Sequence, residues 1–121
     1  MTKRILIIED QADNRQIMHD ALAASGYESL EARTGEEGLA LAQHEKPDLI
    51  LMDIQLPGID GYEVTRRIKR NAELTAIPII AVTSYALSGD DQKAFAAGCD
   101  GYLTKPVSPR LLLAKIKEYL A

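Results

Sequence analysis

Short apolar runs of strand length that alternate with segments of helical periodicity are the feature that most constrains the fold of this chain. A short continuous apolar run is typical of a strand that is buried on both faces. Because parallel strands need a helix-length crossover between them, regular alternation of strands and helices implies a parallel sheet covered by helices on both faces. The sequence therefore predicts a doubly wound α/β fold with strands at Arg4–Glu9, Glu28–Arg33, Asp48–Asp53, Pro78–Thr83 and Gly101–Thr104.

Residues that favour helix starts and ends support this alternation. Each strand is followed by a residue that can accept a hydrogen bond from the first helical turn: Asp13, Thr34, Asp60, Ser88 and Ser108. Gln or Glu stands three positions after the first three of these, as in a capping box, Asp91 follows Ser88 at the same spacing, and Pro109 follows Ser108. Gly26 and Gly98 lie where the first and fourth helices should end in the left-handed conformation.

Length and composition predict one cytoplasmic domain spanning residues 1–121, because a chain of this size builds a single core. No apolar run approaches the roughly 20 residues of a membrane span, and no signal-peptide pattern precedes the first strand. Cys99 is the only cysteine, which excludes disulfides within the chain and cysteine-rich zinc sites. We therefore expect no association with a membrane.

The net charge of −4 argues against nonspecific nucleic-acid binding, which requires a basic surface. The basic run at residues 66–70 is the one opposing signal, and we interpret it as a solvated helix face. No glycine-rich phosphate loop follows the first strand, so nucleotide binding is disfavoured as well. We therefore expect no nucleic-acid partner.

Polar residues gather where the expected strands end. Asp53 follows directly on Leu49–Met52, where a lone carboxylate would cost several kcal/mol without compensation. The other strand ends carry Glu9-Asp10, Thr83-Ser84 and Lys105-Pro106. Because the working site of an open parallel sheet lies beyond the carboxyl ends of its strands, we expect these side chains to meet at one edge.

The residue types at this edge indicate phosphoryl chemistry. Two unit charges about 4 Å apart repel by about 4 kcal/mol at an effective dielectric constant near 20, so three clustered carboxylates need a cation. Mg²⁺ suits them, because it takes one or two carboxylates and keeps water or phosphate oxygens as other ligands. Lys105 can contact one phosphate oxygen and the Thr83 hydroxyl another. The set is interpreted as an acidic nucleophile, a metal ion and a tetrahedral anion.

The whole chain resembles the receiver domain of two-component response regulators, which has the CheY-like, flavodoxin-like (βα)5 fold with sheet order 2-1-3-4-5. The stretches "KPDLILMDIQLPGIDGYEVTRRIK", "IPIIAVTSYALSGD" and "GCDGYLTKPVS" carry this resemblance. The joint occurrence of Glu9-Asp10, Asp53, Thr83 and Lys105-Pro106 is highly specific for the family.

The resemblance implies that Asp53 accepts a phosphoryl group from a phosphohistidine on a sensor histidine kinase or a histidine phosphotransfer protein. Mg²⁺ would be held by Asp10, Asp53 and the Gln55 backbone carbonyl, with Glu9 acting mainly through water. A monomer that can dimerise on phosphorylation is expected. The protein would not be an enzyme, beyond assisting its own phosphotransfer and slow autodephosphorylation.

The resemblance also implies roles for the remaining site residues. Lys105, in a cis peptide with Pro106, would pair with the phosphate, and the backbone N–H groups of Ile54 and Ser84 would line its oxygens. Thr83 would move toward the phosphoryl group and Tyr102 would turn inward. This movement would reshape the face built from the fourth helix, the fifth strand and the fifth helix, and so change the binding of a downstream protein target.

Some positions depart from the commonest family pattern. Ser84 replaces the usual alanine, but it is small enough to leave Asp53 accessible. Gln55 and Tyr85 occupy positions that tune the lifetime of the acyl phosphate in the family, so the sequence leaves that lifetime open. If residue 121 is the native end, the output must be protein–protein binding, whereas a longer chain could carry an effector domain.

Two other functions compete with this interpretation. A phosphatase of the haloacid dehalogenase type also uses a strand-end aspartate nucleophile, but it needs a second aspartate two residues later, where this chain has Gln55, and a cap insertion. A receiver-like interaction module that signals without phosphorylation should lack part of the acidic and lysine set, and this chain keeps all of it.

Overall fold

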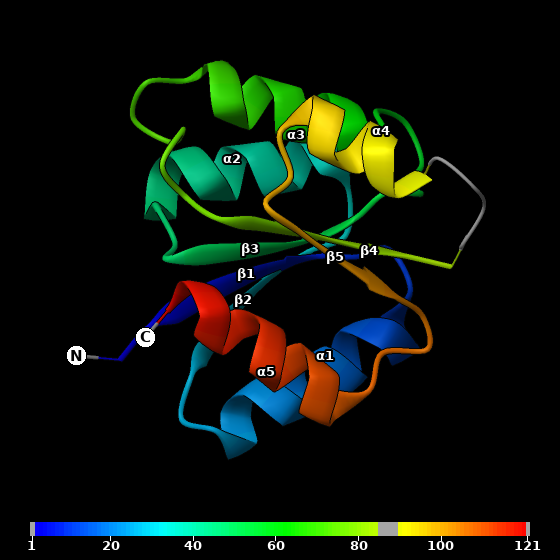
Figure 1. Ribbon diagram of the computed structural model, residues 1–121. Helices are drawn as coiled ribbons and strands as arrows, with labels where there is room; N and C mark the ends of the chain where they lie inside the picture. Colours follow the sequence, from blue (N-terminus) through cyan, green and yellow to red (C-terminus); the bar gives the residue numbers. More distant parts are fainter. Residues whose placement is uncertain (1, 85–89, 121) are drawn as a thin grey trace.

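A five-stranded parallel sheet in the order β2-β1-β3-β4-β5 forms the centre of the computed structural model, which describes residues 2–84 and 90–120 (Figure 1). This confirms the predicted fold class and strand order. The strands are β1 (Arg4–Ile8), β2 (Glu28–Ala32), β3 (Leu49–Asp53), β4 (Ile79–Thr83) and β5 (Gly101–Thr104). The helices are α1 (Ala12–Ala24), α2 (Gly35–Glu45), α3 (Gly61–Arg70), α4 (Asp90–Ala97) and α5 (Pro109–Tyr119). Within the described ranges no helix is long and apolar enough to cross a membrane.

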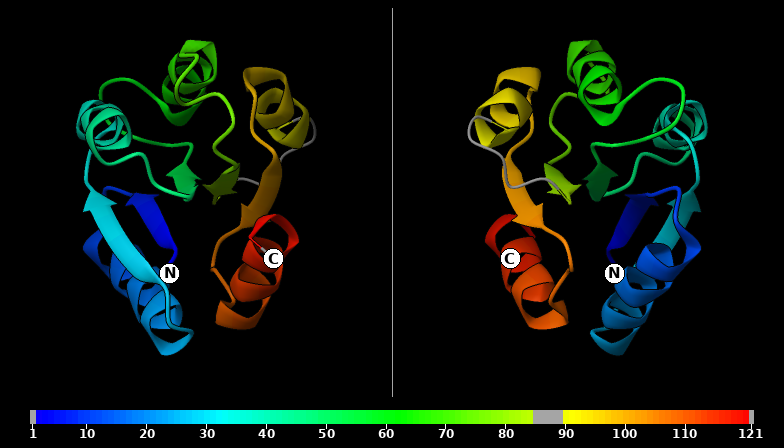
Figure 2. Two further views of the ribbon diagram at one scale, coloured as in Figure 1. Left: turned by 90° about the vertical axis from the view of Figure 1, so that its left-hand side faces the viewer. Right: turned by 90° about the vertical axis from the view of Figure 1, so that its right-hand side faces the viewer.

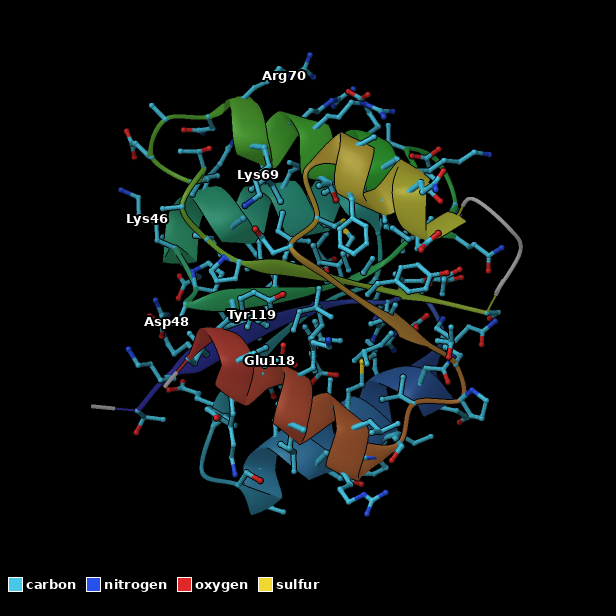
Figure 3. The ribbon with its side chains drawn as sticks, in the orientation of Figure 1. Lys46, Asp48, Lys69, Arg70, Glu118 and Tyr119 are labelled. Carbon is cyan, nitrogen blue, oxygen red and sulfur yellow. The ribbon has the colours of Figure 1, made fainter. Side chains whose placement is uncertain are left out.

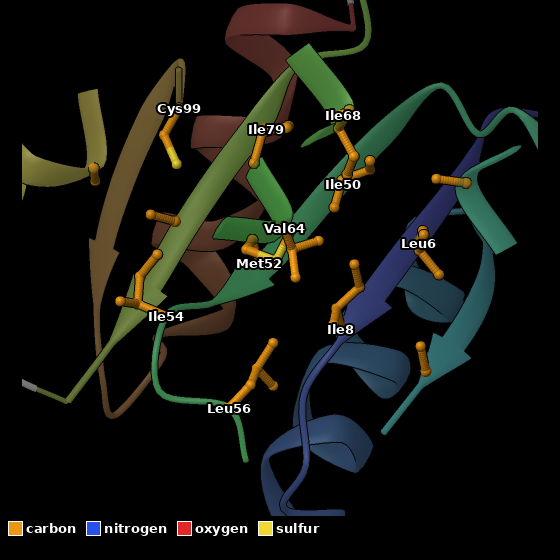
Figure 4. Close-up of a cluster of buried hydrophobic side chains, with 14 of the residues drawn as sticks. Leu6, Ile8, Ile50, Met52, Ile54, Leu56, Val64, Ile68, Ile79 and Cys99 are labelled. Atoms are coloured by element: carbon orange, nitrogen blue, oxygen red, sulfur yellow. The ribbon is translucent and has the colours of Figure 1, made fainter. Parts of the chain in front are cut away.

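Helices cover both faces of the sheet, α1 and α5 on one side and α2, α3 and α4 on the other (Figures 1 and 2). Successive residues of a strand point to opposite faces, so a strand buried on both faces needs apolar residues throughout. In β3, Leu49 and Leu51 join the core beneath α1 and α5. Ile50 and Met52 join the core beneath α2, α3 and α4, which Figure 4 shows.

Most of the predicted helix starts are confirmed. The side chains of Thr34, Asp60 and Ser108 each accept a hydrogen bond from the backbone N–H three residues later. Gly26 and Gly98 have φ of +83° and +117°, as expected of residues that follow a helix end. Ser88 and Tyr85 lie outside the described residues.

The predicted cap at Asp13 is wrong, because α1 begins earlier, at Ala12, with Gln11 in the cap position and no side-chain cap. The Gln11 backbone N–H donates instead to Glu9 Oε2 at 3.2 Å. The Glu9 side chain, which follows β1, therefore stabilises the turn that leads into α1. The helix has already begun at Asp13, which lies in its first turn.

The amino edge of the sheet is braced by aspartates that precede two strands. Asp48 accepts from the Arg4 N–H at 2.8 Å, and Asp100 accepts from the Ile79 N–H at 2.9 Å. Lys69 and Tyr119, labelled in Figure 3, connect Asp100 to α3 and α5 through hydrogen bonds of 3.1 and 2.7 Å. These bonds fix the edge of the sheet that lies away from the polar strand ends.

Candidate functional site

Three carboxylates meet at the carboxyl edge of the sheet, which faces the viewer on the right of Figure 2. Ile8 of β1 pairs with Met52 of β3, so the residues that follow them, Glu9 and Asp53, are neighbours across the two strands. One carboxylate oxygen from each of Glu9, Asp10 and Asp53 lies within 4.8 Å of the others. Glu9 and Asp53 are buried and Asp10 is exposed, so the cluster opens to solvent on one side.

Lys105 enters the cluster from the loop after β5. Its Nζ lies 2.7 Å from Glu9 Oε1 and 3.4 Å from Asp53 Oδ1, and its side chain is 10% exposed. The Lys105 backbone N–H donates to the Thr83 carbonyl at 2.8 Å, and the peptide bond to Pro106 is cis, as the resemblance implied. The ammonium therefore serves two carboxylates at once.

The local environment favours a proton on the Asp53 carboxyl when no cation is bound. Burial, together with hydrogen bonding to Glu9 and the negative charge of Glu9, raises the pKa of Asp53 to about 7. A hydrogen bond from the Gln55 N–H to Asp53 Oδ1, 3.0 Å long, and the charge of Lys105 act in the opposite direction. At neutral pH the Asp53 carboxyl is therefore only partly ionised, and a further positive charge nearby would favour the carboxylate form.

The donor set fits a hard divalent cation. Within residues 2–84 and 90–120, Glu9 Oε1 has no hydrogen bond of good geometry, although Lys105 Nζ is within ion-pair distance. The three clustered carboxylates carry more negative charge than this one ammonium offsets, and a divalent cation would offset the rest. Oxygen ligands, two of them from buried carboxylates, are what Mg²⁺ prefers.

Gly61, at the start of α3, lets the helix approach the end of β3. A Cβ at this position would lie 2.4 Å from the Asp53 carbonyl oxygen and 2.7 Å from the Ile54 Cα. The Gly61 N–H donates to the Ile54 carbonyl at 2.9 Å. Only glycine permits this contact, which holds the backbone that carries Asp53.

The remaining predicted residues occupy the expected strand ends. Thr83 is buried at the end of β4, Ser84 is exposed beside it, and Tyr102 is half-buried in β5 against the core beneath α4. The Ile54 N–H is engaged with the Val82 carbonyl at 3.2 Å and would have to leave it to contact a phosphate oxygen.

Two contacts were not predicted from the sequence. The Gln55 N–H binds Asp53 Oδ1, a local turn that aspartate often forms with the second residue after it, and that tendency was the available signal. Arg15 Nη1 donates to the Glu9 and Asp10 carbonyls, a contact that no sequence pattern indicates.

A parallel sheet of this order, with an acidic cluster and a lysine at its carboxyl edge, defines the class of CheY-like proteins. The family model described as the response regulator receiver domain matches residues 5–117, and the chain belongs to this family. It is 47% identical over 120 residues to the polar-differentiation response regulator DivK of Brucella ovis, an alignment that covers 99% of this chain and 98% of the relative.

Solved structures agree with this assignment. A CheY-like receiver domain protein from Methanospirillum hungatei superimposes with a TM-score of 0.91 at 38% identity, covering 99% of this chain and 94% of that one. The receiver domain of a sensor histidine kinase from Pseudomonas aeruginosa has a TM-score of 0.92 at 32% identity, covering 99% and 98%. That structure holds a magnesium ion coordinated in its active site cleft.

Proposed function

We propose that this chain is a phospho-accepting response regulator in which Asp53 receives a phosphoryl group from a phosphohistidine. The observation that carries the proposal is the buried Asp53 carboxylate between Lys105, 3.4 Å away, and the acidic pair Glu9 and Asp10. Membership of the receiver family and the similarity to DivK support it. The donor is a sensor histidine kinase or a histidine phosphotransfer protein.

In this transfer an Asp53 oxygen forms a bond to phosphorus while the bond from phosphorus to the histidine nitrogen breaks. Asp53 must be ionised to attack, and Lys105 opposes the protonation that burial favours. The Lys105 ammonium is placed to donate a hydrogen bond to a phosphate oxygen in place of its contact with the Asp53 oxygen. The buried Thr83 hydroxyl lies at the neighbouring strand end, where it can contact a second oxygen.

Glu9, Asp10, Asp53 and the Gln55 carbonyl would hold Mg²⁺, Glu9 mainly through water. When bound, the ion offsets the charge that accumulates on the carboxylates and the phosphoryl oxygens. The site leaves room for this, because Asp10 is exposed and a substrate phosphate can complete the coordination. The magnesium ion in the Pseudomonas aeruginosa receiver domain supports the assignment.

The output of phosphorylation is a change in protein binding. Thr83 would move toward the phosphoryl group, and Tyr102, half-buried in β5, would turn inward and reshape the face of α4, β5 and α5. The protein would act in the cytoplasm as a monomer that can dimerise on phosphorylation. It would be a signalling acceptor and not an enzyme with a separate substrate.

The test is incubation with acetyl phosphate, with and without Mg²⁺, followed by intact-mass measurement and NMR. We expect a mass increase of one phosphoryl group that requires Mg²⁺, with shift changes around Thr83 and Tyr102. Asp53→Asn should abolish the adduct, because the attacking carboxylate is gone. Thr83→Ala should retain the adduct and weaken the shift changes.

A protein that gains no phosphoryl group under these conditions, and shows no shifts with beryllofluoride, would be a receiver-like module that signals without phosphorylation. Sustained turnover of small phosphomonoesters would instead indicate a phosphatase of the haloacid dehalogenase type. Either result would overturn the proposal.

A further inference from the structure

Arg15, in the first turns of α1, reaches back to the segment that carries the acidic pair. Its Nη1 donates to the Glu9 carbonyl at 2.9 Å and to the Asp10 carbonyl at 3.1 Å. The Arg15 side chain is 11% exposed, so water competes only weakly for these bonds. One guanidinium is therefore bonded to the backbone of two of the three residues in the acidic cluster.

These two bonds report the conformation of the chain between Glu9 and Asp10. In an extended strand, consecutive side chains and consecutive carbonyls point in opposite directions. One nitrogen can contact both carbonyls only where the chain has turned. The same turn brings the carboxylates of Glu9 and Asp10 to the same side of the sheet edge, within 4.8 Å of Asp53.

Arginine suits this position for two reasons. Its guanidinium stays protonated at every physiological pH, so the contact does not depend on the titration of the acids. Its planar array of N–H groups also holds a fixed geometry, which an ammonium does not. The positive charge lies on the backbone side of the acidic pair, while Lys105 faces the carboxylates.

A second contact anchors the guanidinium to the edge strand. Arg15 Nε lies 3.7 Å from Glu31 Oε1 of β2, and Glu31 pairs with Ile7 in the sheet. The Glu31 side chain is 42% exposed, and exposed ion pairs contribute little free energy. The carbonyl bonds therefore carry most of the effect, and Glu31 restricts where the guanidinium lies.

We infer that Arg15 is a positioning residue for the cation site, because it holds the turn that presents Glu9 and Asp10 to Mg²⁺. The inference rests on the proposed function. Removing a residue that orients metal ligands through hydrogen bonds, without binding the metal itself, weakens metal affinity by roughly tenfold or more. Arg15 does not touch the cation or the phosphoryl group in this role.

Arg15→Met tests the inference, because methionine keeps an unbranched apolar stem and removes every donor. We expect Mg²⁺ to bind roughly tenfold more weakly, measured by NMR amide shifts in a Mg²⁺ titration of the unphosphorylated protein. Arg15→Lys restores the charge without the planar donors and should bind with intermediate affinity. Arg67→Met is the matched control, because Arg67 on α3 pairs with Glu63 at 2.8 Å, away from the site. The Mg²⁺ affinity of this variant should equal that of the wild type.

Amide spectra and circular dichroism establish that each variant is folded. A folded Arg15→Met protein whose Mg²⁺ dissociation constant stays within about twofold of wild type overturns the inference, even if its stability falls. If Arg15→Met does not fold, the Mg²⁺ affinity of Arg15→Lys is the test. An affinity equal to that of the wild type in this variant would overturn the inference. A wild-type protein that binds no Mg²⁺ and accepts no phosphoryl group would instead overturn the proposed function and this inference with it.

Discussion

Asp53 lies at the end of a fully buried strand, whereas the proposed phosphoryl transfer requires its carboxyl to be negatively charged. Burial places a carboxylate where its ionised form is costly, and Glu9 adds repulsion. Lys105 and the Gln55 N–H reduce the cost without removing it. Ionised Asp53 therefore keeps an electrostatic cost that a bound cation would reduce.

The raised pKa of Asp53 predicts a pH-dependent stability without Mg²⁺. Between the ordinary value of 3.8 and about 7, the native state binds a proton that the unfolded chain releases, so stability is greatest below this window and falls as pH rises through it. In EDTA, wild type should lose roughly 4 kcal/mol relative to Asp53→Asn between about pH 4 and 8, because the pKa of Asp53 is raised from 3.8 to about 7 and each pKa unit corresponds to about 1.4 kcal/mol. Urea unfolding at each pH measures this difference.

Asp20→Asn is the control for this measurement, because Asp20 is an exposed residue of α1. Its stability curve should run parallel to that of wild type across the whole range. If the Asp53→Asn curve also ran parallel to wild type, the protonation of a buried Asp53 would not contribute to stability.

Residue types at strand ends could be predicted, whereas contacts made by backbone groups could not. Asp53 and Lys105 were predictable because a charge beside an apolar run is conspicuous in a sequence. The Arg15 contact depends on where a long side chain of α1 meets two carbonyls of the preceding turn. No periodicity encodes that meeting, so only the folded chain reveals it.

Among the helices, α3 directly contacts the backbone of the site, because its first residue, Gly61, packs against Asp53. Asp60 caps this helix by accepting the Glu63 N–H at 2.9 Å. The start of α3 and the end of β3 are therefore in direct contact, so that a shift of one backbone segment should displace the other.

Gly61→Ala should destabilise the protein by about 1–3 kcal/mol, because the added methyl group overlaps the Asp53 carbonyl and the chain must shift. It should also move the NMR amide signals of Asp53 and Ile54. Asp60→Ala is the comparison, because it removes the cap at a cost of about 1 kcal/mol and leaves the contact with Asp53 intact. Equal effects of the two variants on the Asp53 signal would contradict the role given to Gly61.

Element boundaries show where prediction from sequence stops. The strands agree with prediction within one residue at each end. The apolar runs of β1, β3 and β4 are unambiguous, whereas β2 contains Glu28, Ser29 and Glu31 and lies at the edge of the sheet. The start of α1 was misplaced, since Asp13 and Gln16 have capping-box spacing that the chain does not use. A hydrogen bond from Gln11 to Glu9, which depends on the tertiary turn, overrides the local signal.

For the whole molecule, a cation that binds only the native state should raise the free energy of unfolding. At a Mg²⁺ concentration tenfold above its dissociation constant, the expected gain is about 1.4 kcal/mol. Thermal or urea unfolding with Mg²⁺, against NaCl of equal ionic strength, measures it. Asp10→Asn should lose most of the gain, because it removes one of the three clustered carboxylates.

Asp13→Asn is the control, since this exposed aspartate lies in the first turn of α1 and outside the cluster. It should retain the full Mg²⁺ effect. Equal stabilisation by MgCl₂ and NaCl would show that general screening, and not a bound ion, is responsible.

The shared ammonium of Lys105 sets the charge of the site before and after signalling. Three carboxylates and one ammonium sum to −2, which one divalent cation neutralises. Replacing the Asp53 carboxylate by an acyl phosphate, which carries a charge of about −2, would leave the loaded site with a net charge near −1. In the proposed function, phosphorylation would therefore leave one unbalanced negative charge at the sheet edge, and hydroxyl and N–H groups that moved toward it would transmit the change to the protein surface.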